Sequence, residues 1–66
     1  MLDVRYVLTP VGRLVDTYPM NDGKPALEYR DGVWIEYGGL VSELWEGKKL
    51  TEEDATMLIL KEKYKR

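Results

Sequence analysis

The first part of the chain alternates between apolar and other side chains with a period of two, which is typical of a half-buried β-strand. The apolar side of this strand consists of Leu2, Val4, Tyr6 and Leu8. A turn follows at 9–12, because proline at its second position and glycine at its fourth suit a type I turn closed by a left-handed residue. We expect 13–18 to return as a second strand, in a register that places Leu8 opposite Leu14. The segment 19–25 lies between two prolines and is expected to be a loop.

A second hairpin is predicted over 26–37, around an Asp-Gly pair. A two-residue turn would pair Tyr29 with Trp34 and leave both faces of the hairpin mixed. A three-residue loop with Gly32 in the left-handed conformation instead pairs Tyr29 with Val33. That register collects an apolar face and sends Trp34 to the charged face. We expect the second register, because pairing follows the arrangement that gives a clean apolar face. The apolar face would comprise Leu27, Tyr29, Val33, Ile35 and Tyr37.

After two consecutive glycines the apolar residues recur at helical spacing and predict a short amphipathic helix. Its apolar stripe is formed by Leu40, Val41, Leu44 and Trp45, and Trp45 is expected to be part of the core. Gly47 is a natural stop for this helix. A second helix is expected to begin at Thr51, whose side chain and Asp54 resemble a capping box. Within it, 56–60 is predicted to be helical, with a final strand as the alternative.

Together these elements predict an α+β fold, in which a small antiparallel sheet of two β-hairpins is packed by a C-terminal helical hairpin. The 66 residues allow a single domain, 1–66. A chain this short buries only about 60% of the surface that its unfolded form exposes, so its core is small. Small domains often add a disulfide, a metal or a second subunit. The sequence has no cysteine and no histidine, which leaves self-association as the available support.

The inventory of reactive side chains argues against an enzyme. Ser42 is the only serine, and no histidine exists to activate it. Three neighbouring carboxylates, Glu52, Glu53 and Asp54, would splay over about 200° of a helix and would not converge on one atom. Their place in a first turn is explained by capping and by the helix dipole. We therefore expect no catalytic residues, no metal site and no cofactor.

Composition bears on location and on the class of partner. The longest clearly apolar run, 57–60, is too short to span a bilayer. No signal peptide is visible, and the absence of cysteine fits a reducing compartment. We therefore expect a cytoplasmic protein that does not bind membranes. The net charge of −2 argues against general nucleic-acid binding.

A nucleic-acid-binding protein is nevertheless the alternative function, because the chain ends in a cluster of basic residues. The members of this cluster are Lys61, Lys63, Lys65 and Arg66. The two predicted helices also resemble a helix-turn-helix superficially. The acidic first turn of the second helix argues against that role, because it would face phosphates of like charge.

The second helix carries apolar residues on two sides. Ala55, Leu58 and Ile59 cluster on one side, and a second group clusters nearly opposite. The members of the second group are Met57, Leu60 and Tyr64. One side can pack on the sheet, and the other needs the first helix, a second subunit or another protein.

We therefore expect a small non-enzymatic protein-interaction module, adaptor or regulatory, that forms a homodimer. Met57, Leu60 and Tyr64 are its predicted contact residues. Trp34 is the second candidate, because a large aromatic on a charged surface is typical of a binding hot spot. The partner would be another copy of the chain, another protein, or both.

Overall fold

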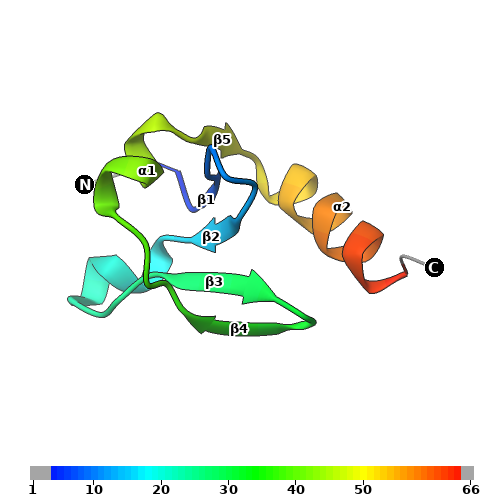
Figure 1. Cartoon of the computed structure of the whole chain (residues 1–66), viewed down its shortest axis with the longest axis horizontal. Helices are drawn as coiled ribbons and strands as arrows, with labels where there is room; N and C mark the ends of the chain where they lie inside the picture. Colours follow the sequence, from blue (N-terminus) through cyan, green and yellow to red (C-terminus); the bar gives the residue numbers. More distant parts are fainter. Residues whose placement is uncertain (1–3, 65–66) are drawn as a thin grey trace.

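The computed structural model describes residues 4–64. Its centre is one five-stranded antiparallel sheet in the order β4-β3-β2-β1-β5, so that β4 and β5 form the two edges (Figure 1). The strands are β1 (Tyr6–Leu8), β2 (Leu14–Asp16), β3 (Leu27–Arg30), β4 (Val33–Glu36) and β5 (Lys48–Leu50). The other elements are a 3-10 helix η1 (Tyr18–Asp22) and the helices α1 (Val41–Glu46) and α2 (Glu52–Lys63). The predicted α+β fold is confirmed. The predicted helical hairpin is not, because β5 lies between α1 and α2.

The first hairpin has the predicted register. Leu8 lies opposite Leu14, and Val7 lies opposite Val15. At the turn, the amide of Gly12 donates to the carbonyl oxygen of Thr9 at 2.9 Å, and Gly12 has the left-handed φ of 87°. The local turn chemistry of proline and glycine thus determines how β1 and β2 pair.

The second hairpin has the register that the sequence disfavoured. Asp31 and Gly32 both have positive φ, 52° and 85°, which is the conformation of a two-residue type I′ turn. Tyr29 therefore faces Trp34 rather than Val33. The left-handed Gly32 is confirmed, and the three-residue loop is wrong. Strand β4 is an edge strand without a buried residue, and Val33 and Ile35 are 55% and 39% exposed. A clean apolar face is therefore not required of this hairpin.

The sheet is covered on both faces, and each face has its own core. Neighbouring residues of a strand point to opposite faces, so Leu14 and Val15 of β2 belong to different cores. The core on the α1 side, here called the α1 face, consists of Val15, Ala26, Tyr37 and Leu44. The core on the α2 side, the α2 face, consists of Leu14, Leu50 and Ala55. Partly buried residues pack around this second core, namely Tyr6, Leu8, Tyr29, Trp34, Leu58 and Ile59.

A buried carboxylate accompanies the α1 face of the sheet. Glu28 is only 3% exposed. Its Oε2 lies 3.3 Å from Nε of Arg30 and 3.7 Å from Nε of Arg13. A buried charge is tolerated when it is paired in this way, and the two arginines therefore allow a glutamate inside β3.

Helix α1 packs differently from the predicted stripe. Leu44 is 1% exposed, whereas Trp45 is 53% exposed and is not part of the core. The hydroxyl of Tyr37 donates to Oε1 of Glu43, and its oxygen lies 3.1 Å from the carbonyl oxygen of Leu40. Glu43 and Trp45 lie about 200° apart around the axis, one on each side of Leu44. Because Glu43 is turned toward Tyr37, Trp45 is turned toward solvent.

Helix α2 begins where the sequence predicts. The hydroxyl oxygen of Thr51 accepts a hydrogen bond from the amide of Asp54 at 3.1 Å, which satisfies one of the free amides of the first turn. Leu50 and Ala55, just before and just inside the helix, are buried in the same core. The segment 56–60 is helical, as predicted.

Candidate functional site

The side of α2 that faces away from the sheet is apolar and exposed. Met57 is 63% exposed, Leu60 is 42% exposed and Tyr64 is 73% exposed. We call these three residues the outer stripe of α2. The possibility that α1 covers them is wrong, because Leu44 of α1 packs into the core on the other face of the sheet. The outer stripe has no apolar cover within the described part of the chain.

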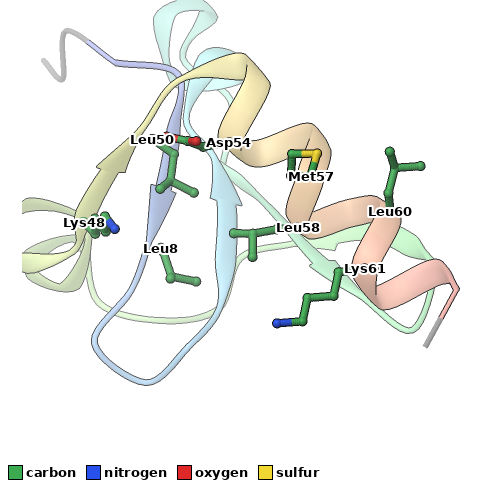
Figure 2. Close-up of a pocket in the computed structure, with 8 residues that line it drawn as sticks. All are labelled: Leu8, Lys48, Leu50, Asp54, Met57, Leu58, Leu60 and Lys61. Atoms are coloured by element: carbon green, nitrogen blue, oxygen red, sulfur yellow. The ribbon is translucent and has the colours of Figure 1, made fainter. Parts of the chain in front are cut away.

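A hollow of about 620 Å³ adjoins the outer stripe. Figure 2 shows it between α2 on one side and the strands β1 and β5 on the other. The strands contribute Leu8, Lys48 and Leu50, and α2 contributes Asp54, Met57, Leu58, Leu60 and Lys61. Because Met57 and Leu60 belong to both, the stripe and the hollow form one continuous apolar surface.

The hollow exists because α2 is only partly packed on the sheet. Ala55 is its one buried residue between 52 and 63, while Leu58 and Ile59 are half-buried. Thr51 and Leu50 hold the start of the helix against β5, and the later turns extend away from that strand (Figure 1). The space between the helix and the β1–β5 edge is therefore left open to solvent.

Charged side chains lie around this apolar surface. Lys48 comes from β5, and Asp54 and Lys61 come from α2. None of the three makes an ion pair with another residue in the range 4–64. All three are exposed, so each is free to pair with a bound molecule. Charges of both signs at the hollow are therefore available to an occupant that also presents both signs.

The strand side of the hollow was missed in the sequence. The sequence predicts no strand between the two helices, whereas Lys48, Lys49 and Leu50 form β5. A strand of three residues is too short to show a period of two. Its only sequence signal is that Leu50 follows Lys48 by two positions, which places both side chains on the α2 face.

The sequence predicted Trp34 on a charged face of the hairpin, and this prediction is wrong. Its ring lies 5.2 Å from that of Tyr29 in an edge-to-face arrangement, and 6.4 Å from that of Tyr6. It is half-buried beside the core of the α2 face. The type I′ register causes this, because it pairs Trp34 with Tyr29. Its role as a second contact residue remains a prediction.

The described basic residues of the alternative function, Lys61 and Lys63, lie on different sides of α2. Lys61 and Lys63 are exposed on α2, but residues two apart lie about 200° apart around a helix. Lys65 and Arg66 lie outside the described residues. The presence of β5 between α1 and α2 also removes the resemblance to a helix-turn-helix.

The carboxylates and the serine considered in the sequence lie at exposed positions of the two helices. Glu52, Glu53 and Asp54 are exposed in the first turn of α2, and Ser42 is exposed on α1. Within 4–64, no group of three or more acidic side chains is placed to hold a metal ion.

The clear pKa shifts belong to residues that support the fold. Burial raises the pKa of Tyr37 to about 12, and its hydrogen bond to Glu43 acts in the same direction. The hydrogen bonds from Arg5 to Asp16 raise the pKa of the guanidinium above its usual value. Neither group lines the hollow, so these shifts do not point to chemistry at this surface.

No family model matches the chain, and no curated protein and no solved structure matches it either. Among the helices of residues 4–64, none has the length and apolar character needed to cross a bilayer. The case for a function therefore depends on the geometry of the α2 surface.

Proposed function

We propose that the protein is a small non-enzymatic protein-interaction module, adaptor or regulatory, and that the outer stripe of α2 with the adjoining hollow is its binding surface. The observation that carries this proposal is the continuity of an exposed apolar stripe with a hollow lined by leucines. Soluble proteins rarely leave such surfaces uncovered, and apolar patches rimmed by polar residues mark interaction sites.

The form of the surface suits a helical or otherwise apolar protein segment. Met57 and Leu60 stand on the helix side, and Leu8 and Leu50 stand on the strand side. An amphipathic helix laid in such a groove buries its apolar residues between the two walls. A homodimer is the simplest assembly of this kind, because two copies offer the same surface to each other.

This proposal is favoured over nucleic-acid binding by the distribution of charge. Affinity for nucleic acid depends on several cations that reach neighbouring phosphates. The described part of α2 has Lys61 and Lys63 on different sides, and its first turn is acidic. Binding through the apolar surface should change little with added salt, whereas binding to phosphates should weaken steeply.

Site-specific crosslinking tests the proposed surface. A photoreactive phenylalanine analogue replaces Met57 in one variant and Val11 in a control variant, since Val11 is equally exposed at 64% but lies in the β1–β2 turn. In cells of the native host, we expect position 57 to crosslink to a protein that mass spectrometry identifies, and position 11 not to. An absence of protein adducts at 57, or the same adducts at both positions, would contradict the proposal.

A further inference from the structure

The geometry points to a second copy of this chain as the occupant of the hollow, bound through a two-fold antiparallel pair of α2 helices. This inference rests on the proposed interaction role of the α2 surface and names its partner. It depends on the order of charges along α2 and on the positions of Asp54 and Lys61 beside the outer stripe.

The charges along α2 make the helix complementary to itself when reversed. Its first turn carries Glu52, Glu53 and Asp54, and its last turn carries Lys61 and Lys63. An antiparallel pair brings the acidic start of each helix to the basic end of the other. A parallel pair would bring like charges together, which is unfavourable in helix pairs.

Two of these charges, Asp54 and Lys61, lie on the same side of α2, next to the outer stripe. Asp54 and Lys61 are seven residues apart, so they lie within about 20° of each other around the helix and about 10 Å apart along it. Met57 lies between them, and all three line the hollow. The charges therefore flank the apolar contact on the side of α2 that faces the open space.

A two-fold axis beside Met57 and Leu58 brings these charges together across the interface. Counted along two antiparallel helices, the position opposite Asp54 is then that of Lys61 of the partner subunit. The symmetry repeats the pair, so each dimer contains it twice. Met57 of each copy then lies beside Met57 of the partner subunit at the centre.

The hollow has the chemistry to receive such a helix. Its apolar wall is extended by Leu8 and Leu50, and Lys48 adds a further cation that is free to pair. The partner helix would bring its own exposed Met57 and Leu60 into this space. One arrangement thus covers the outer stripe of both copies and neutralises the charges beside it.

The test exploits the two-fold repetition of the charge pair. The dissociation constant of the wild-type dimer is measured by sedimentation over a concentration series. Asp54→Lys places two like-charged pairs in the dimer, and so does Lys61→Glu. We expect each variant alone to dimerise roughly tenfold more weakly or worse. Glu46→Lys on α1 is the control for Asp54→Lys, since it changes the net charge by the same amount and should leave the constant unchanged.

Mixing the two charge variants provides the decisive measurement. In a heterodimer of Asp54→Lys with Lys61→Glu, both pairs again join opposite charges. An equimolar mixture should therefore form a dimer about as tight as the wild type, while circular dichroism shows that each variant is folded. Weakened single variants without rescue in the mixture would overturn the antiparallel register.

The outcome also separates this inference from the proposed function. A chain that stays monomeric at every concentration, while position 57 crosslinks to a different protein, would overturn the second copy as partner and retain the interaction surface. A monomeric chain without any crosslink at position 57 would remove both. A dimer that Glu46→Lys weakens as much as Asp54→Lys would place the interface elsewhere and overturn the inference.

Discussion

The shorter of the two helices, α1, is packed more closely on the sheet than the longer one, α2. Helix α1 has 6 residues and places Leu44, which is 1% exposed, in the centre of a core. Helix α2 has 12 residues, yet Ala55 is its only buried side chain. The length of a helix therefore does not determine its burial in this domain. What matters is whether neighbouring groups fix the helix close to the sheet.

Two features bring α1 close to the sheet and have no equivalent on α2. The hydroxyl of Tyr37 donates to Glu43 and so fixes the rotation of the helix. Gly47, directly after the helix, lies against β1, where a Cβ atom would come within 2.5 Å of Cγ1 of Val7 and 2.6 Å of the carbonyl oxygen of Leu8. The α1 face is closed by specific contacts, whereas the α2 face keeps an open surface.

The largest expected difference between the faces concerns leucine truncation. Leu44→Ala should lower the free energy of unfolding by about 2–5 kcal/mol, because it leaves a cavity in a closed core. Leu58→Ala should cost about 1–2 kcal/mol, because Leu58 is half-buried and borders the hollow. Urea unfolding of both variants measures the difference. A chain of this length has a total stability of roughly 3–10 kcal/mol, so we expect Leu44→Ala to populate the unfolded state even without urea. Equal losses would show that the two faces are packed alike.

The close approach of α1 to β1 predicts a smaller loss at Gly47. Gly47→Ala should lower the free energy of unfolding by about 1–3 kcal/mol, because the added methyl group overlaps Val7 and the backbone of Leu8. Gly38→Ala is the matched control, since a Cβ atom there has no neighbour within 4 Å. Thermal or urea unfolding compares them. A cost at Gly47 no larger than that at Gly38 would be inconsistent with the tight approach.

The hydrogen bond between Tyr37 and Glu43 predicts a smaller effect still, with a defined pH dependence. Tyr37→Phe should lower stability by about 1 kcal/mol at neutral pH. The pKa of Tyr37 is raised from 10.0 to about 12 in the folded chain, so folding favours the protonated hydroxyl. This contribution is complete below pH 10 and is lost as the pH rises toward 12. Urea unfolding between pH 8 and pH 12 should show that loss in the wild type, and a smaller one in the variant.

The smallest effect is expected on the outer stripe. Met57→Gln keeps the size and helix preference of the side chain, and Met57 is 63% exposed. The stability of the folded monomer should therefore stay within about 0.5 kcal/mol of the wild type. Unfolding is followed at concentrations where the chain is monomeric. A loss above about 1 kcal/mol would mean that Met57 supports the fold, and that the stripe is not a free surface.

The parts of the fold that sequence analysis predicted are those set by local chemistry. Proline and glycine fix the β1–β2 turn, and the hydroxyl of Thr51 caps α2 as expected. The exposed position of the outer stripe followed from helical periodicity, because two apolar sides of one helix cannot both face a sheet. The three residues of the outer stripe could therefore be predicted from the sequence.

The errors concern features that depend on contacts distant in sequence. Glu28 is buried because β3 pairs with β2, which places it opposite Val15, and Arg13 and Arg30 pair with its charge there. Trp45 is exposed because the contact between Tyr37 and Glu43 rotates α1. Strand β5 forms by pairing with β1, and its three residues carry little signal of their own. Without β5, the strand wall of the hollow could not be predicted.

The two edges of the sheet bear on how copies of the chain can join. Open edges expose unpaired backbone groups and invite strand-to-strand aggregation, which short strands and lysine side chains oppose. Edge β5 has 3 residues, two of them Lys48 and Lys49. A second copy adding to this edge in antiparallel fashion would bring lysines against lysines. Pairing of two β5 edges is thereby disfavoured, whereas pairing through α2 closes once two copies have met.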